Sequence, residues 1–355
     1  MTHSHRATAR SRRVNPDRGR GCCQRLSRID CRHLSVLPIF HAWGMQTVNI
    51  ARPRPGDSMA FTDRVASAPI TWGIDPSPGW GYVIPRDRYL EEMTSLGLTA
   101  TELGPDGYLP ADPEELATFL DDRGLTVIGG WVPLALATDA LFQEQRDYLV
   151  RACQQFQRVG ADVVVLGPVW NYQGYDAKNT LTDDEWATFL ANLAETDAIA
   201  RDNGLRVALH QHVGTVIETQ ADLDRLLADS DVALCVDTGH MLSAGIDPVQ
   251  VVRDHSDRVA HMHLKDISTA QAAKVANGEL GFRDAVKGGL FRPLGAGDVD
   301  LPAVIGTLES SGYTGWYAIE QDCSLTEEPA PGQGPVNHCR TSLQYLRNLA
   351  TTNGW

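Results

Sequence analysis

The chain has 355 residues, a hydrophobic content of 43% and a formal net charge of −14. Its length is sufficient for one barrel of about 250 residues with extensions, so we expect one domain with a tail. No run of about 18 apolar residues predicts a membrane span and no secretory signal is evident, so we expect a cytoplasmic protein without a membrane partner. The seven cysteines include no CxxC pair, which argues against a zinc finger or a disulfide framework.

The charge is unevenly distributed along the chain. Residues 1–58 carry 11 arginines and a net charge of +8, whereas residues 59–355 carry −22. An Arg-rich leader is compatible with a nucleic-acid arm or a transit peptide, but Met59 opens a conventional start. We therefore expect 1–58 to be an unstructured leader, or to result from a start site assigned too early. The acidic remainder disfavours nucleic-acid binding, because contacts to phosphate supply most of the non-specific affinity.

From residue 69 onward, short apolar or β-branched runs alternate with helical patterns, which is typical of repeated βα units and a parallel sheet. The runs lie at 69–74, 100–105, 125–132, 161–169, 206–213, 232–240, 259–266 and 315–322. The helical patterns include 88–96, 113–123, 143–159, 183–203 and 221–228. Eight units predict a single-domain (β/α)8 TIM barrel over 59–355. An open doubly wound sheet is the alternative, and the absence of GxGxxG after the first run weakens its dinucleotide-binding form.

Polar side chains gather at the carboxyl ends of the predicted strands, where a (β/α)8 barrel builds its active site. In "HQH" (210–212) the two histidines point to the same face of a strand, because successive side chains alternate. The whole set comprises Asp75, Glu102, His210, His212, Asp237, His240, His261, His263, Lys265, Glu320 and Asp322.

Imidazoles and carboxylates from four successive strands suit a divalent ion such as Mn²⁺, Co²⁺, Mg²⁺ or Zn²⁺. The ligand candidates are Asp237, His263 and Glu320, with His210 or His212 as the fourth. Burying so many ionisable groups without a partner is costly, which favours a metal over separate structural roles for each residue.

Each of these residues also has a structural interpretation. A single strand-end histidine is more often a hydrogen-bonded core residue than a ligand, and Asp237 is a favoured type for a helix cap. Lys265 and Asp266 are compatible with an ion pair at the barrel rim.

Three motifs carry a resemblance to a known family. "VDTGH" (236–240), "HMHLKD" (261–266) and "YAIEQD" (317–322) resemble the sugar isomerase/epimerase-like, or xylose isomerase-like, metal-dependent TIM barrels. The resemblance covers about 69–350. Most members carry a Glu on the fifth strand, where this chain has His210, so the resemblance implies that His210 takes that ligand position.

Further segments resemble one branch of that family, the inosose (2-keto-myo-inositol) dehydratases. They are "TELGPDGYLP" (101–110), "HQHVGT" (210–215) and "AVKGGLF" (285–291). The resemblance implies a hydro-lyase of myo-inositol catabolism that acts on a small keto-polyol. Such a dehydration removes a proton beside a carbonyl, forms an enolate that a divalent metal stabilises, and protonates the departing hydroxyl.

Residues around the metal set are candidates for proton transfer and for substrate binding. The proton-transfer candidates are Lys265, His240, His212 and Glu102, of which Lys265 or His240 is favoured. The predicted substrate contacts are Trp72, Asp75, Tyr108, Trp131, Gln211, Asp266, Lys287 and Arg292.

The segment 267–297 is too long for an ordinary βα loop. A lid over the site, a contact within a homo-oligomer and a tolerated insertion are the three interpretations. For the whole chain, the alternatives to a dehydratase are an isomerase or epimerase on the same barrel, a metal-dependent apurinic endonuclease and a non-catalytic sugar-binding barrel. The −22 charge of 59–355 disfavours the endonuclease.

Overall fold

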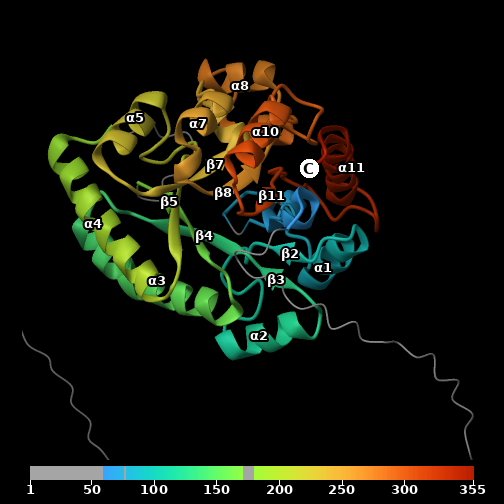
Figure 1. Cartoon of the computed structure of the whole chain (residues 1–355), viewed down its shortest axis with the longest axis horizontal. Coiled ribbons are helices and arrows are strands. Elements are labelled where there is room, and N and C mark those ends of the chain that lie inside the picture. The colour runs from blue at the N-terminus through green and yellow to red at the C-terminus, as the bar shows by residue number, and fades with distance from the viewer. Residues whose placement is uncertain (1–58, 76, 171–179) are drawn as a thin grey trace, which may run out of the picture. The chain divides into compact units, whose positions relative to one another are not determined.

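The computed structural model describes residues 59–75, 77–170 and 180–355 (Figure 1), so the predicted leader 1–58 lies outside the described residues. The strands are β1 (Val65–Ser67), β2 (Ala100–Thr101), β3 (Thr126–Val127), β4 (Gly129–Leu134), β5 (Val163–Pro168), β6 (Arg206–His210), β7 (Ala233–Asp237), β8 (Val259–Leu264), β9 (Asp266–Ile267), β10 (Phe291–Arg292) and β11 (Tyr317–Ile319). The α-helices are α1 (Arg86–Ser95), α2 (Pro113–Asp121), α3 (Asp139–Val159), α4 (Asp183–Asp202), α5 (Gln220–Asp229), α6 (Thr238–Ser243), α7 (Pro248–His255), α8 (Thr269–Ala276), α9 (Phe282–Lys287), α10 (Leu301–Ser311) and α11 (Pro335–Asn353). Short 3-10 helices are η1 (Phe61–Arg64), η2 (Pro69–Trp72) and η3 (Ser256–Arg258).

The main sheet is a parallel barrel. Its strand order is β3-β2-β1-β11-β8-β7-β6-β5-β4, so β3 and β4 stand at the two ends of the order. These two strands are consecutive in the chain and separated only by Ile128. Ile128 donates a backbone hydrogen bond to Thr101, and Leu103 donates one to Gly129, so the β3–β4 segment closes the sheet against β2. The predicted (β/α)8 TIM barrel is confirmed.

The first strand is the one predicted element that is misplaced. The run 69–74 was predicted as a strand, but β1 lies just before it and Pro69–Trp72 forms the 3-10 helix η2. Pro69 lacks an N–H for a sheet ladder and suits the first helical position, and Gly73 ends the turn at a φ of 75°. The other predicted runs each overlap a barrel strand.

The predicted helices begin at local capping signals. Thr182 and Glu185 form a reciprocal capping box at α4, and Thr219 and Asp222 do the same at α5. Helices α3 and α4 lie side by side outside β4 and β5 (Figure 1). No helix among the described residues is long and apolar enough to cross a membrane.

The long segment after β8 is folded. Strands β9 and β10 form an antiparallel pair, in which Ile267 lies opposite Phe291, and helices α8 and α9 lie between them in the chain. The segment 267–297 is therefore a two-stranded ribbon that carries two short helices, and its role as a lid or an oligomer contact stays a prediction.

Small and apolar residues occupy one end of the barrel interior. Ala66, Ala100, Ile128 and Ala318 form one apolar cluster, and Val163, Val165, Ala208 and Cys235 belong to a second. Strand side chains alternate, so the residue two positions further along each strand lies on the same face, nearer the carboxyl end. Two positions after Ala100, Ala208, Cys235 and Ala318 come Glu102, His210, Asp237 and Glu320, respectively. The polar site therefore lies directly above an apolar layer.

Candidate metal centre

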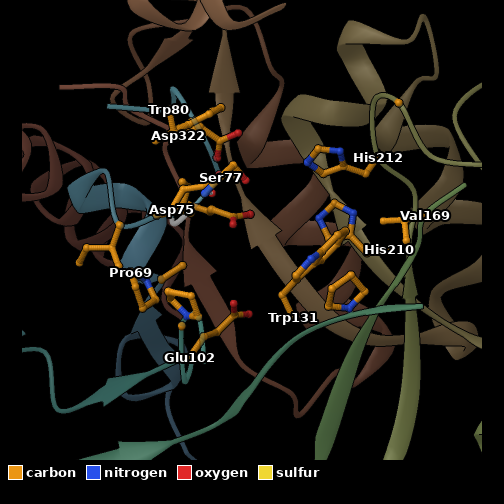
Figure 2. A pocket seen from close by; sticks show the side chains of 18 of the residues that line it. Pro69, Asp75, Ser77, Trp80, Glu102, Trp131, Val169, His210, His212 and Asp322 are labelled. Atoms are coloured by element: carbon orange, nitrogen blue, oxygen red, sulfur yellow. The ribbon is translucent and has the colours of Figure 1, made fainter. Parts of the chain in front are cut away.

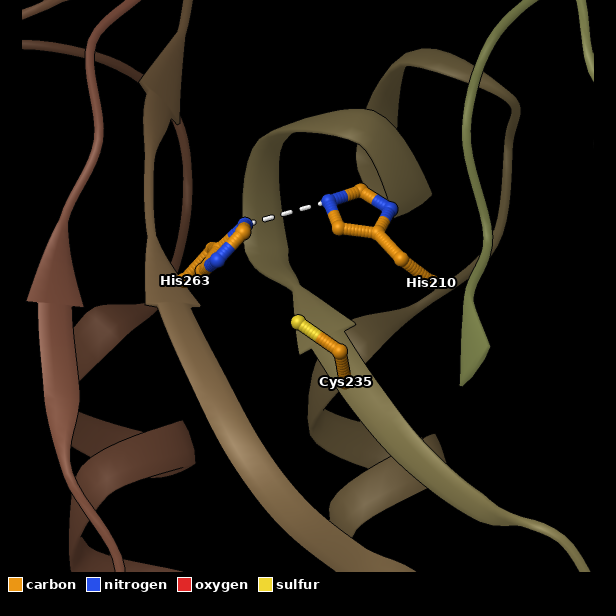
Figure 3. Close-up of side chains that lie close together, drawn as sticks. All are labelled: His210, Cys235 and His263. Atoms are coloured by element: carbon orange, nitrogen blue, oxygen red, sulfur yellow. Dashed lines mark hydrogen bonds between the residues drawn. The ribbon is translucent and has the colours of Figure 1, made fainter. Parts of the chain in front are cut away.

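Four buried or nearly buried side chains meet at the carboxyl end of the barrel. His210, Asp237, His263 and Glu320 each offer one donor atom, and these atoms all lie within 4.8 Å of one another. His210 Nε2 lies 3.1 Å from His263 Nδ1 (Figure 3), which in turn lies 2.5 Å from Glu320 Oε2. Both ring nitrogens lie 3.6 Å from Asp237 Oδ2. We call these residues the four-residue cluster; they are the four predicted from the sequence as ligands.

For each imidazole, the hydrogen bond made by the ring nitrogen that points away from the cluster determines which nitrogen faces the cluster and whether it carries a proton. His210 Nδ1 lies 2.7 Å from the Gln211 carbonyl oxygen, which only accepts, so Nδ1 carries the proton and Nε2 a lone pair. His263 Nε2 lies 2.7 Å from Glu102 Oε1, which leaves Nδ1 to face the cluster. Two imidazole nitrogens are thereby directed at the same point as two carboxylate oxygens.

Each carboxylate of the cluster directs one oxygen toward the imidazoles and Lys265 Nζ without making a hydrogen bond. Asp237 Oδ1 accepts the backbone N–H groups of Gly239 and His240, as expected for a helix cap. Asp237 Oδ2 and Glu320 Oε2 are buried and make no hydrogen bond with any described residue, although Lys265 Nζ lies 3.1 and 3.3 Å away. Buried carboxylate oxygens that are left open in this way suit a cation.

The electrostatics of the cluster also call for a positive charge. Burial alone would lower the pKa of His263, but the Glu320 and Glu102 carboxylates raise it well above the usual histidine value. Burial would raise the pKa of Asp237, but the Lys265 ammonium holds it well below its usual range. The cluster thus attracts a cation at its centre, either a proton on His263 or a metal ion, and the donor set fits a divalent transition metal.

Cys235 lies below the two histidines (Figure 3), two residues before Asp237 on β7. Its Sγ is close enough to His210 and His263 to form an alternative three-residue group with them. Burial raises the pKa of this thiol to about 11, so it remains protonated near neutral pH. The four-residue cluster adds two carboxylates to the same two imidazoles, and this negative charge favours it as the position of a divalent metal.

Lys265 joins the cluster to a second group of polar residues. Its Nζ lies 2.8 Å from His240 Nε2 and 2.9 Å from Asp322 Oδ1. Burial lowers the pKa of Lys265, but Asp237, Asp322 and Glu320 raise it above the usual lysine value. The charged ammonium therefore donates to His240 Nε2, which acts as the acceptor.

The two remaining histidines of this group are neutral. Burial and the Lys265 ammonium lower the pKa of His240 well below its usual value. They also lower the pKa of His212, to about 3. Their ring centroids are 3.8 Å apart. Both rings can therefore accept or donate a hydrogen bond without carrying charge.

A cavity of about 550 Å³ opens beside the cluster, a volume suited to a small molecule. Figure 2 shows Asp75, Trp80 and Asp322 on one side, opposite His210 and His212 on the other. Its lining also includes Pro69, Glu102, Pro133, Tyr148, Trp170, His263, Arg283 and Glu320. The cavity thus combines apolar surfaces with the polar groups of the cluster.

Trp131 lies edge-on to His210, with ring centroids 5.3 Å apart and an interplanar angle of 87°. Its indole occupies the space above Gly167, where any Cβ atom would overlap the ring. The glycine on β5 is therefore required for the position of this tryptophan on the cavity surface.

Of the predicted substrate contacts, Asp75 and Trp131 line the cavity. Trp72, Tyr108, Gln211, Asp266, Lys287 and Arg292 are not among the described residues that line it. Trp72 Nε1 donates to Glu92 and the Tyr108 hydroxyl donates to the Ile84 carbonyl, both at 2.9 Å, so these aromatic residues are held in the surrounding packing. The role of these six residues as substrate contacts stays a prediction, and the structure places them outside the lining of this cavity.

The other four predicted substrate contacts lie outside the cavity lining because of their local surroundings. Gln211 Nε2 donates to the Glu218 carbonyl at 2.7 Å, and Asp266 accepts four backbone N–H groups of its own ribbon and the following loop. Asp266 is therefore not the ion-pair partner of Lys265. Lys287 is exposed and Arg292 is half-buried on the inserted segment.

Several lining residues were missed from the sequence. Arg283 Nη1 donates to the Pro78 carbonyl at 2.7 Å, which connects α9 to the loop after η2 beside the cavity. Tyr148 comes from α3 and Trp170 follows β5, and neither carries a sequence signal for this position. Asp322 was placed among the polar side chains at the strand ends, but no role was assigned to it.

A family model described as xylose isomerase-like TIM barrel matches residues 90–349. Inosose dehydratase of Lacticaseibacillus casei is 32% identical over 302 residues, which cover 81% of this chain and 97% of that protein. Inosose dehydratase of Geobacillus thermodenitrificans is 31% identical over 294 residues, which cover 80% of this chain and 96% of that protein.

Solved structures share the fold at lower identity. L-ribulose 3-epimerase superposes with a TM-score of 0.62 at 17% identity, covering 83% of this chain and 95% of that one. The IOLI protein with a bound zinc atom gives a TM-score of 0.61 at 14% identity, and the match covers 81% of this chain and 98% of that one. With the barrel and its buried His/Asp/Glu cluster in place, the family match over most of the chain leads to one conclusion: the chain belongs to the xylose isomerase-like TIM barrel family.

Proposed function

We propose that this chain is a metal-dependent dehydratase that removes water from a cyclic keto-polyol, with 2-keto-myo-inositol (inosose) as its substrate in myo-inositol catabolism. The observation that carries the proposal is the convergence of four donor atoms, two of them open carboxylate oxygens, beside a cavity of about 550 Å³. The substrate follows from the inosose dehydratases, to which this chain is 32% and 31% identical over nearly their whole length.

His210 Nε2, Asp237 Oδ2, His263 Nδ1 and Glu320 Oε2 would hold the metal. We assign Mn²⁺ or Co²⁺, with Mg²⁺ and Zn²⁺ as alternatives, because two imidazoles in the donor set favour a transition metal over Mg²⁺. When bound, the ion supplies Lewis acidity that stabilises negative charge developing on the substrate carbonyl oxygen. Two neutral imidazoles cancel less of the metal charge than two carboxylates would.

Proton transfer is assigned to Lys265 and His240, which are in contact at 2.8 Å. Neither is among the described residues that line the cavity, whereas Asp322 lines it and lies 2.9 Å from Lys265 Nζ. Asp322 therefore connects the pair formed by Lys265 and His240 to the cavity. His212 also lines the cavity and is placed to orient a substrate hydroxyl.

The apolar part of the lining binds the carbon skeleton. Trp80, Trp131 and Trp170 present aromatic surface to the cavity. A cyclic polyol has C–H groups that pack on such surfaces while its hydroxyls point to polar groups. The same side chains keep bulk water away from the reacting atoms.

The test is incubation of the metal-loaded protein with 2-keto-myo-inositol, followed by mass spectrometry of the product. We expect a product lighter than the substrate by one water, and no conversion by His263→Ala. A product of unchanged mass would identify an isomerase or epimerase instead. A parallel panel of acyclic ketoses tests the preference for a cyclic substrate.

A purified wild-type protein that neither binds nor is activated by any divalent ion would contradict both enzyme assignments. It would leave a sugar-binding barrel as the remaining interpretation.

A further inference from the structure

Glu102, which the sequence pointed to as a proton-transfer candidate, makes an unusual pair of contacts. A single oxygen, Oε1, lies 2.8 Å from His261 Nε2 and 2.7 Å from His263 Nε2. Both histidines come from β8, two residues apart and on the same face of the strand. All three side chains are at most 6% exposed, so water does not compete for these hydrogen bonds.

The direction of these bonds follows from the chemistry of the groups. An ionised carboxylate only accepts, and a neutral imidazole has one N–H and one lone pair. Glu102 Oε1 lies within hydrogen-bond distance of two ring nitrogens, so it accepts from both, as a carboxylate oxygen with two lone pairs can. His263 therefore donates from Nε2, and Nδ1, the atom that faces Asp237 and Glu320, carries the lone pair whenever the ring is neutral.

The other histidine of the cluster is held differently. His210 donates from Nδ1 to the backbone carbonyl of Gln211, an acceptor that no side-chain substitution removes. His263 is thus the one imidazole of the four-residue cluster whose tautomer depends on a side chain.

We infer that Glu102 is a positioning residue, which holds His263 in the Nε2–H tautomer so that Nδ1 is available to a metal ion. It does not transfer protons to or from the substrate. His261 supplies the second donor that fixes Glu102 Oε1 in place. A carboxylate behind a metal-binding histidine orients the ring and raises its basicity as a ligand. The inference depends on the metal site of the proposed function and is independent of the substrate.

The test compares Glu102→Leu, which removes the acceptor, with Glu102→Gln, which keeps an amide oxygen of similar reach. His261→Ala is the matched control, because it removes the other donor and leaves the bond between Glu102 and His263. Metal dissociation constants are measured on metal-free protein by competition with a chromophoric chelator, using Co²⁺ and Zn²⁺ without substrate. Thermal unfolding of the metal-free proteins shows that each variant folds.

We expect Glu102→Leu to weaken metal binding by about 10–100-fold, the usual effect of losing such a partner. Glu102→Gln should lose less metal affinity than Glu102→Leu, and His261→Ala should lose the least. The absorption bands of bound Co²⁺ should shift in Glu102→Leu, because the ligand ring is no longer held. Activity of Glu102→Gln should return when the metal concentration is raised.

Three results would overturn the inference. One is wild-type metal affinity in Glu102→Leu together with a lost turnover that excess metal does not restore, which would make Glu102 a catalytic residue. Another is an equal loss of affinity in Glu102→Leu and His261→Ala, which would indicate general damage to the site. The third is a wild-type protein that binds neither ion, which would refute the metal site itself. Failure of inosose as substrate, by contrast, would leave the binding results unaffected.

Discussion

Asp237 and Asp266 are both completely buried carboxylates, at the end of β7 and at the start of β9, yet their hydrogen bonds differ in one respect. Both carboxylate oxygens of Asp266 accept backbone N–H groups at 2.9–3.0 Å. Oδ1 accepts from Ile267 and Val299, and Oδ2 accepts from Gly295 and Gly297. Asp237 uses only Oδ1 in this way, and its Oδ2 remains open toward the cluster.

The difference separates a structural carboxylate from one suited to bind a ligand. Asp266 ties the loop after β10 to the ribbon, and its charge is neutralised by fixed N–H dipoles. Asp237 caps α6 with one oxygen and offers the other, so it places a negative charge where a cation is needed. Burial alone does not distinguish the two residues, whereas a count of hydrogen bonds for each oxygen does.

The largest expected effect is that of Asp237→Asn on metal binding. The amide oxygen can keep the cap of α6, while an NH2 group then faces the cluster and repels a cation. Metal affinity should fall by more than about 100-fold, because loss of a direct ligand exceeds the effect of an outer-sphere partner. Metal at 100 times the wild-type dissociation constant should stabilise wild type by about 2.7 kcal/mol and the variant hardly at all. Thermal unfolding with and without metal measures both quantities, and an undiminished metal-induced shift in Asp237→Asn would refute the ligand role.

Asp266→Asn is the matched substitution in the other region. An amide has one acceptor oxygen, so the N–H groups of Gly295 and Gly297 would face an NH2 group. We expect a loss of about 2 kcal/mol in the free energy of unfolding, measured by urea denaturation of the metal-free protein. Metal affinity of the folded variant should stay within a few-fold of wild type. The comparison fails if Asp266→Asn loses metal binding without losing stability.

Gly297→Ala tests the same region by adding a methyl group to the loop that Asp266 holds. A methyl group there would overlap Asp266 Oδ1 and the Ile267 carbonyl oxygen, and neither atom can move without breaking a hydrogen bond. We expect a loss of about 1–2 kcal/mol of unfolding free energy, typical of overpacking, with metal affinity unchanged. A lowered metal affinity in a variant of normal stability would show that the ribbon and the cluster are not separate.

Gly239→Ala is the counterpart beside Asp237 and has the smallest expected effect. A methyl group would lie 2.6 Å from Lys265 Cγ, so the lysine stem must shift while its contacts with Asp237 and His240 are disturbed. We expect a kcat lower by about tenfold or less, from displacement of a proton-transfer group, and little change in metal affinity. Steady-state kinetics at saturating metal measures it, and an unchanged kcat would argue against Lys265 in proton transfer.

The barrel and the polar set could be predicted from the sequence because both follow from strand periodicity. His210, Asp237 and Glu320 each lie two residues beyond a small or apolar inward residue, so identifying the strand fixes the face. The structure brings these side chains together with His263, as predicted, and their role as ligands stays a prediction.

The cavity surface was harder to predict, for two physical reasons. Placing the first strand at 69–74 put Trp72 at the barrel mouth, whereas Pro69 starts a 3-10 turn that packs Trp72 beside Glu92. Tyr148 reaches the cavity from α3 and Arg283 from α9, and such contacts depend on how helices sit on the barrel. Strand periodicity carries no information about that packing.

Strand β8 has a consequence for how this chain can vary in length. His261 and His263 share one face with Lys265, and Met262 and Leu264 pack on the other. A single inserted or deleted residue within β8 would exchange the two sets, placing three polar side chains in the apolar packing and removing them from the cluster. Between β9 and β10, only a few residues later, the chain already accommodates two additional helices. Length variation is therefore tolerated immediately after this strand and forbidden within it.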